Sequence, residues 1–235
     1  MTIHKNLQKT LLPLVAAFTF TSALVVTTSY PARAQNDQVA MSAALSAMQK
    51  YTPATTRVAI LPVIDKSGEK DDQRRDQANA VKMEAYDQFF QRGFQIIDEA
   101  TVAKAITDSG INFDDQEEHR KDNLYKVGKA LNADLVMFVV VDQAYSKLKR
   151  NLFNEQREGL AKTRTWLVDV KDQKPLLSAF IREGKSTGNA GLGSKGNRSH
   201  MGAACSNATR DTLNAVLDPF KRDKEKKWPG NKAKG

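Results

Sequence analysis

Four aspartates stand at or near the ends of apolar, β-rich runs of the sequence, and carboxylates in that position can do chemistry. Ligands of open α/β sheets favour the carboxyl ends of the strands, so paired carboxylates there could bind a cation or perform acid–base catalysis. Aspartate is also a common turn and helix-capping residue. Because the strands need not all point the same way, turn and capping roles are the favoured interpretation of all four: Asp65, Asp98, Asp142 and Asp169.

A glycine-rich segment, residues 191–196, matches the spacing G-x-G-x-x-G between a predicted strand and a predicted helix. Such a loop can hold a dinucleotide pyrophosphate at a helix N-terminus, but the fingerprint also needs a following parallel strand that ends in an acid. Only a charged tail follows Phe220, and Lys195 precedes Gly196 rather than the Ser or Thr of a Walker loop. A surface loop is favoured, with nucleotide binding as the alternative. The candidate ligand- or partner-binding loops are this segment and the turn after the first predicted strand: Asp65, Ser67, Gly68, Gly191, Gly193 and Gly196.

Thiol and imidazole chemistry is sparse in a chain with one cysteine and three histidines. Cys205 shares an apolar helical stripe with Ala204 and Ala208, which predicts a buried, inert thiol rather than a nucleophile paired with His200. His119 stands among charged residues on a predicted solvent-facing helix surface. No Cys/His cluster has the spacing of a zinc site. The sequence therefore predicts no catalytic residues, no metal and no cofactor, and a protein that is not an enzyme.

The first 34 residues have the three parts of a secretory signal: a basic head, an uncharged and mostly apolar run over 11–26, and small residues that end in Ala32-Arg33-Ala34. This pattern predicts cleavage between Ala34 and Gln35, and a periplasmic or secreted protein. A retained membrane anchor is the alternative, because residues 11–32 are just long enough to span. Proline, threonine and serine dilute that run, which favours cleavage. No cysteine lies near the site, so we do not expect a lipid anchor.

The basic charge is concentrated at the C-terminus. Removing residues 1–34 lowers the formal net charge from +9 to +6, and residues 221–235 carry seven basic and two acidic side chains. The rest of the chain is close to neutral, which argues against a nucleic-acid partner. A disordered basic tail is the favoured interpretation. The alternative is peripheral contact with an anionic envelope surface through Lys221, Arg222, Lys224, Lys226, Lys227 and Trp228.

Hydrophobic periodicity predicts alternating helices and strands. The predicted helices are 35–50, 72–92, 99–109, 114–131 and 200–220, and the predicted strands are 57–64, 94–98, 135–141, 163–170 and 176–183. Leu135–Val141 reads LVMFVVV, and seven consecutive apolar residues predict a central strand that is covered on both faces. We therefore expect one α/β sandwich domain over 57–220, with a mixed sheet of about five strands covered by helices. Residues 35–56 are a short helix and a linker before it.

Two segments carry no such prediction. Gln143–Gly159 is charged and lacks a clear period, so it does not read as a pair of strands. Gly188–Ser199 is glycine-rich and reads as a flexible loop before the last helix. Lys171-Asp172-Gln173-Lys174, by contrast, predicts a hairpin turn between the last two strands. Pro62 cannot donate to a strand ladder, so it should lie at a strand end, a bulge or an edge-facing position.

Several phrases of the sequence occur in an order that resembles the CsgG-like family of curli assembly and secretion and the related N-terminal domain of TolB. They are RVAILPVIDKSG, RGFQIIDEATVAKAI, YKVGKALNADLVMFVVV and TWLVDVKDQKPLLSAFIREGKSTG, and they cover about Arg57–Gly188. Most matched positions form the core and are not chemical. Val63 stands where that family has Phe after Pro62, and Asp172-Gln173 stands where its hairpin usually has Thr-Gly.

The resemblance implies a stand-alone soluble α/β domain without lipid anchor, membrane hairpins or propeller. It implies an exported, non-enzymatic adaptor of the cell envelope that binds envelope or secreted proteins, with a homo-oligomer as a further possibility. The alternative is a small-ligand or nucleotide-binding protein, or a hydrolase, that uses the strand-end acids or the glycine-rich loop.

Overall fold

The computed structural model of the chain describes residues 29–113, 121–151, 154–189, 197–226 and 228–229. It divides into two units, Met1–Gln38 and Val39–Gly235, of which the second holds the sheet. The described residues of the first unit belong to helix α1 (Ser29–Met48). This helix runs through the expected cleavage position between Ala34 and Gln35, and cleavage itself stays a prediction. No helix in the described ranges is both long and apolar enough to cross a membrane.

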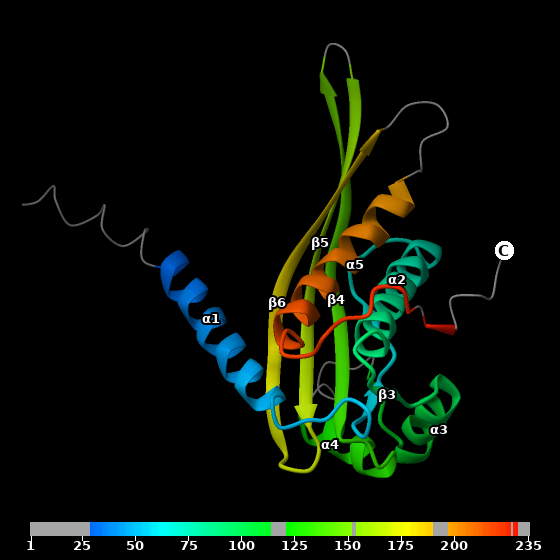
Figure 1. The fold of residues 1–235 in the computed structure, drawn as a ribbon. Helices are drawn as coiled ribbons and strands as arrows, with labels where there is room; N and C mark the ends of the chain where they lie inside the picture. The colour runs from blue at the N-terminus through cyan, green and yellow to red at the C-terminus, as the bar shows by residue number, and fades with distance from the viewer. Residues whose placement is uncertain (1–28, 114–120, 152–153, 190–196, 227, 230–235) are drawn as a thin grey trace, which may run out of the picture. The chain divides into compact units, whose positions relative to one another are not determined.

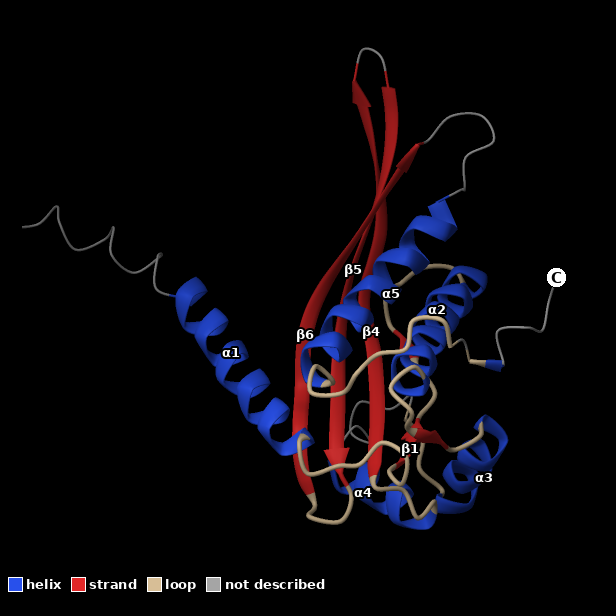
Figure 2. Ribbon diagram, in the orientation of Figure 1, coloured by secondary structure: helices blue, strands red, loops and turns tan. Residues whose placement is uncertain are grey.

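One mixed sheet organises the second unit (Figure 2). Its strands follow the order β3-β1-β4-β5-β6, and a two-residue strand, β2, also pairs with β4. The pairs among β1, β2, β3 and β4 are parallel, whereas β4, β5 and β6 run antiparallel. The strand bounds are β1 Arg57–Ile60, β2 Ile64–Asp65, β3 Gln95–Ile96, β4 Leu135–Asn151, β5 Asn154–Asp169 and β6 Lys174–Asn189. The predicted α/β class with a mixed sheet is confirmed, with β2 added to the five strands of the main path.

The first half of β4 is the centre of the domain. Every residue of Leu135–Val141 is at most 1% exposed, because side chains on this strand alternate between two apolar layers. Leu135, Met137, Val139 and Val141 belong to one buried cluster, and Val136, Phe138 and Val140 belong to the other. The predicted central strand with both faces covered is therefore confirmed.

Within the described part of the chain, five helices cover the two faces of the sheet. One layer is formed by the end of α1 together with α2 (Asp71–Phe90) and α5 (Asn197–Val216), through buried residues such as Met48, Phe89 and Leu213. The other layer is formed by α3 (Glu99–Ser109) and α4 (Lys121–Ala130), through buried residues such as Val102 and Leu124. Figure 1 shows α2 and α5 beside the long strands.

Glycines allow α5 to lie directly on β5 and β6. A Cβ atom on Gly184 would stand 2.0 Å from the carbonyl oxygen of Ala204, and a Cβ atom on Gly159 would stand 2.1 Å from that of His200. A Cβ atom on Gly188 would stand 2.4 Å from the His200 ring. These distances are far below van der Waals contact, so side chains larger than hydrogen would push the helix away from the sheet.

Most predicted elements are observed with small changes at their ends. Residues 57–64 were predicted as one strand, but they form two, because Pro62 interrupts the ladder between β1 and β2. Its expected place at a strand end is thereby confirmed. The expected stops after α2 and α3 are glycines in the left-handed region, Gly93 with φ 86° and Gly110 with φ 66°. Of the helix predicted over 114–131, residues 114–120 lie outside the described part of the chain.

The prediction for Gln143–Gly159 was wrong. These residues form the second half of β4 and the first part of β5, paired from Gln143↔Lys162 to Asn151↔Asn154. A bulge between Val141 and Gln143 breaks the strand period at Asp142, which removes the alternation from the sequence. Beyond the bulge, the ladder continues from the buried strands while helices cover little of the sheet, so charged residues occur on both faces.

The predicted loop over Gly188–Ser199 is also shorter than expected. β6 continues through Gly188 to Asn189, and α5 begins at Asn197, three residues before the predicted helix start. Gly188 pairs with Arg157 on β5 and makes room for the His200 ring, so it serves close packing rather than a flexible turn. Residues 190–196, which include Gly191, Gly193 and Gly196, lie outside the described part of the chain.

Candidate functional site

The four strand-end aspartates do not converge on one site. Asp65 on β2 pairs with Val141 of β4, whereas Asp169 on β5 pairs with Leu135 at the other end of the buried half of β4. The six-residue separation along β4 corresponds to about 20 Å at the usual rise of a strand. A paired-carboxylate centre built from these two residues is therefore excluded by the register of the sheet.

In three of the four aspartates, both carboxylate oxygens accept hydrogen bonds. The side chain of Asp98 caps α3 and accepts a hydrogen bond from the Thr101 N–H at 2.9 Å. Asp142 accepts two hydrogen bonds from Arg164, at 2.9 and 2.6 Å to one carboxylate oxygen, and a third at 2.7 Å to the other. Asp169 is buried and paired with Lys50. The favoured capping role is confirmed for Asp98, and the other two hold ion pairs.

Asp169 lies in a polar hollow of about 340 Å³ at the hairpin turn between β5 and β6. Lys50, just after α1, donates to the carboxylates of both Asp169 and Asp172. Burial by itself raises the pKa of Asp169, but the hydrogen bonds from the Asp172 N–H and Lys50 help to outweigh it, and the pKa lies below its ordinary value. The carboxylate is therefore ionised and used to fasten the end of α1 to the β5–β6 turn.

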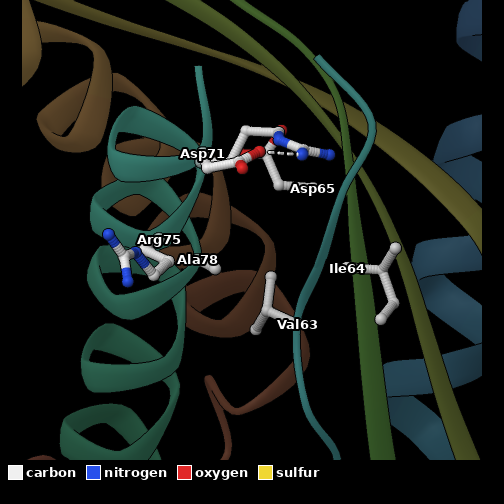
Figure 3. A pocket seen from close by; sticks show the side chains of 7 residues that line it. Val63, Ile64, Asp65, Asp71, Arg75 and Ala78 are labelled. Atoms are coloured by element: carbon white, nitrogen blue, oxygen red, sulfur yellow. Dashed lines mark hydrogen bonds and ion pairs between the residues drawn. The ribbon is translucent and has the colours of Figure 1, made fainter. Parts of the chain in front are cut away.

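Asp65 differs from the others, because it lines an open hollow of about 520 Å³ between β2 and the first turns of α2 (Figure 3). One carboxylate oxygen accepts a hydrogen bond from the Ser67 N–H at 2.9 Å. The other oxygen, Oδ2, is covered and has no hydrogen-bond partner in the described structure. Burial raises the pKa of Asp65, and the hydrogen bonds from Ser67 offset this only in part.

The walls of this hollow are charged in both senses. Arg74 pairs with Asp71 on the first turn of α2, and Arg75 follows on the same helix. Val63, Ile64 and Ala78 supply apolar contact. The sequence pointed to Asp65 and the turn through Ser67 and Gly68, but the arginines of α2 had no signal beyond their place on a charged helix. A hollow lined by both acidic and basic side chains can hold a small molecule whose basic group pairs with the Asp65 carboxylate.

The outer edge of β6 is the second candidate surface. Within the described residues, no strand pairs with this edge, since β6 ends the strand order. Its first part is irregular: Pro175 lies there, the register with β5 shifts at Leu167, and Ala179 has a positive φ of 52°. Prolines and bulges of this kind protect a sheet edge from pairing. From Phe180 to Asn189, in contrast, the register with β5 is unbroken over ten residue pairs.

The far ends of β4, β5 and β6 carry a cluster of charges near the start of α5. Glu158 on β5 is paired with Lys149 of β4 at 2.7 Å and with Lys185 of β6. The hydrogen bonds from these two lysines lower the pKa of Glu158 to about 2. Lys149 and Glu158 fall in the segment 143–159, which was not predicted to form strands. A usable signal was the order Ala144, Ser146 and Leu148 alternating with Tyr145, Lys147 and Lys149, once the bulge is skipped.

The C-terminal segment is not a free tail where the structure describes it. Trp228 packs on α2 against Tyr86 and Phe90, and its backbone N–H donates to Asp87 at 2.9 Å. The side chain of Gln91, just after α2, accepts a hydrogen bond from Arg222 Nε at 2.6 Å and donates one to the Lys226 carbonyl oxygen at 2.9 Å. The expectation of a disordered tail from Lys221 is therefore wrong for 221–226 and 228–229. The aromatic rings of Tyr86 and Phe90 on α2 hold the tryptophan.

The remaining candidates are structural or undescribed. Cys205 is fully buried, as predicted, and burial raises its thiol pKa to about 12, so the thiol is inert at neutral pH. His200 is buried against Gly188 rather than placed beside a nucleophile. In the described ranges, no group of three or more His, Cys, Asp or Glu side chains could hold a metal ion. His119 and Lys195 lie outside those ranges.

The chain matches no protein-family model and no curated protein. Its fold is distantly similar, at low identity, to several solved structures. Lipoprotein GNA1162 from Neisseria meningitidis has a TM-score of 0.42 and 12% identity, over 70% of this chain and 96% of that one. The C-terminal domain of LpoB from Salmonella enterica has a TM-score of 0.34 and 9% identity, over 63% of this chain and 94% of that one. A PelC dodecamer from Paraburkholderia phytofirmans has a TM-score of 0.33 and 13% identity, over 70% of this chain and 88% of that one.

Proposed function

We propose that this chain is an exported, non-enzymatic binding or assembly protein of the cell envelope, with a CsgG-like domain that acts through protein–protein contacts. The signal-like first 34 residues support export to the periplasm or the outside. The phrases between Arg57 and Gly188 support the CsgG-like assignment. Neither the strand-end acids nor Cys205 and His200 form a catalytic set, which supports a binding role.

The observation that carries this proposal is the outer edge of β6. From Phe180 to Asn189 it presents backbone donors and acceptors that no described strand uses, and the Lys185 carbonyl oxygen accepts a hydrogen bond from the Asn207 side chain of α5 at 2.7 Å. A partner segment in extended conformation can add to such an edge through main-chain hydrogen bonds, and alternate side chains then give specificity. Glu183, Lys185 and Thr187 are exposed along it and are available for that selection.

Site-specific photocrosslinking in the native host tests the proposal. A photoreactive side chain is placed at Glu183 or Thr187, and at Thr107 of α3 as an exposed control remote from the β6 edge. We expect the two β6 positions to give the same reproducible protein adduct and the α3 position to give none. Adducts that contain a second copy of this chain would identify a homo-oligomer as the complex. The absence of any reproducible adduct at either β6 position would contradict the proposal.

The hollow beside Asp65 supports a second candidate function, the binding of a small molecule with a basic group. What favours it is the covered Oδ2 atom, which lacks a hydrogen-bond partner in the described structure. Thermal-shift screening of polyamines, basic amino acids, nucleotides and divalent cations tests this candidate. A ligand at about a hundredfold excess over its Kd adds about 2.7 kcal/mol of stability. That shift should vanish in Asp65→Asn, and the absence of a shift in all four classes would retire the candidate.

A further inference from the structure

The far end of the three-stranded part of the sheet has an unusual surface. We define this distal sheet end as residues 145–149, 156–160 and 185–188. It holds four basic side chains and one acid: Lys147, Lys149, Arg157, Lys185 and Glu158. Both Lys149 and Lys185 pair with Glu158, which is therefore neutralised by two cations and leaves an excess of positive charge. The basic surface predicted from the sequence was the C-terminal segment, but Trp228 of that segment is bound to α2.

Exposed apolar side chains occur at the same end. Tyr145 is 41% exposed and Leu148 is 39% exposed, and Val39 on α1 is the one other large hydrophobic residue that is exposed in the described structure. The lysine ammonium of Lys147 lies 5.2 Å from the centroid of the Tyr145 ring. Tyr145 and Leu148 point to opposite faces, since three positions separate them on one strand. Beyond Val141, β4 thus exposes an aromatic and an aliphatic side chain, with lysines beside them.

This end of the sheet is accessible. β2 pairs with β4 no farther than Val141, so the outer edge of β4 beyond that residue has no partner strand among the described residues. The start of α5 covers the level of Gly159 and Gly188 on one face, and the buried cluster under α3 and α4 ends on β4 at Val140. Figure 1 shows β4 and β5 continuing past the helices.

We propose that the distal sheet end binds peripherally to an anionic lipid surface. Lysine side chains near an anionic bilayer are attracted to its headgroups, and tyrosine favours the interface between headgroups and hydrocarbon. Lys147 and Lys149 keep their charged ends in the headgroup layer, while Tyr145 and Leu148 supply the apolar contact. The side chains that carry this proposal, Tyr145, Lys147, Leu148 and Lys149, lie on β4, whereas the edge assigned to protein contacts is that of β6. The distal sheet end shares Lys185 and Thr187 with that edge, so the variants expected to lose vesicle binding change only β4 residues and test the lipid proposal separately.

Vesicle co-sedimentation of the full chain tests the lipid proposal. The vesicles are phosphatidylcholine alone or with about 30% phosphatidylglycerol, at about 0.05 M and about 0.5 M salt. We expect binding to the anionic vesicles that falls at high salt. Because each lysine near such a surface contributes about fivefold in affinity, K147Q/K149Q should lower the partition coefficient by about tenfold or more. The neutral glutamines avoid a new repulsion with Glu158.

Matched variants separate a local effect from bulk charge. K171Q/K174Q removes the same charge from exposed lysines at the opposite end of β5 and β6, and it should leave binding unchanged. Y145S/L148S keeps the charge and should weaken binding, while circular dichroism confirms that every variant is folded. All variants share one N-terminus, so its contribution cancels. The proposal is overturned if the chain does not prefer anionic vesicles, or if K171Q/K174Q loses as much affinity as K147Q/K149Q. Lys147 and Lys149 would then serve only to keep the β4 edge from pairing.

Discussion

Trp228 stacks on Tyr86, with ring centroids 5.1 Å apart and ring planes 17° from parallel. Phe90, one turn farther along α2, meets the same indole edge-on at 5.3 Å. Residues 142 positions apart in the chain are in contact in this way, and the C-terminal segment packs against α2. A basic composition alone would have placed this tryptophan in solvent.

Replacing Trp228 by Ala should destabilise the domain. The indole is partly buried and makes two aromatic contacts, so we expect the free energy of unfolding to fall by about 1–3 kcal/mol, below the range for a fully buried tryptophan. Urea denaturation measures this loss. Lys224→Ala, at an exposed position of the same segment, should change stability by less than about 0.5 kcal/mol. Equal midpoints for Trp228→Ala and the natural chain would mean that the segment does not hold α2.

Glu84 on α2 makes stability depend on pH. Although burial by itself raises its pKa, hydrogen bonds from Arg210, Gln88 and Ser206 outweigh that effect and leave the pKa below the ordinary 4.5. A carboxyl whose pKa is lower in the folded state stabilises the fold above the unfolded-state pKa, and this contribution is lost as the pH falls through the folded-state pKa. The ion pair with Arg210 should therefore be intact at neutral pH and weaken below about pH 4.5.

Glu84→Gln tests this dependence. We expect a loss of about 1–3 kcal/mol at neutral pH, less than for a fully buried pair because Arg210 is partly exposed. The loss should shrink toward acid pH, where the natural chain has lost the same interaction. Chemical denaturation across the pH range measures both. The control is Glu99→Gln, whose carboxylate is 67% exposed in its pair with Lys82, so this pair should contribute about 0.5 kcal/mol or less. A Glu84→Gln deficit that stays constant down to acid pH would contradict the assignment.

Gly184 should not tolerate a methyl group. Its Cβ would lie 2.0 Å from the Ala204 oxygen and 2.6 Å from the Ala208 nitrogen, both backbone atoms of α5. Gly184→Ala should therefore cost about 1–3 kcal/mol or more, because the helix must move off the sheet. Gly202→Ala is the matched control, since its Cβ would meet Ala80 at 3.5 Å. That change should be neutral or stabilise α5 by up to about 1 kcal/mol. Similar melting temperatures for the two variants would argue against close packing of α5.

The buried half of the fold could be predicted from the sequence because its physical signal is local. Leu135–Val141 is apolar at every position and rich in β-branched valine, as expected of a strand that is covered on both faces. Glu99–Ser109 was predicted with its observed bounds, since Asp98 caps the start and Gly110 adopts the left-handed conformation at the end. In these elements, propensity, capping and burial all favour the same structure.

The distal sheet could not be predicted in the same way. Its strands are held by register with buried neighbours rather than by their own hydrophobic period, and the bulge at Asp142 shifts the alternation by one residue. The docking of Trp228 is a contact between distant parts of the chain, for which composition has no signal. Asp65 was a candidate in the sequence, but its isolation from Asp169 depends on strand register, which the two runs do not encode.

A pair of neighbouring proline substitutions on β6 distinguishes a used edge from an unused one. Backbone N–H groups along a strand alternate between the two sides, so one of Ser186 and Thr187 donates to β5 and the other points outward. Proline at the donating position should cost about 1–3 kcal/mol through the lost ladder bond. Proline at the outward position should keep the unfolding midpoint within about 1 kcal/mol, as prolines on edge strands do, yet abolish the crosslinked adduct at Glu183. A stable proline variant that retains the full adduct yield would show that the partner binds without pairing to this edge.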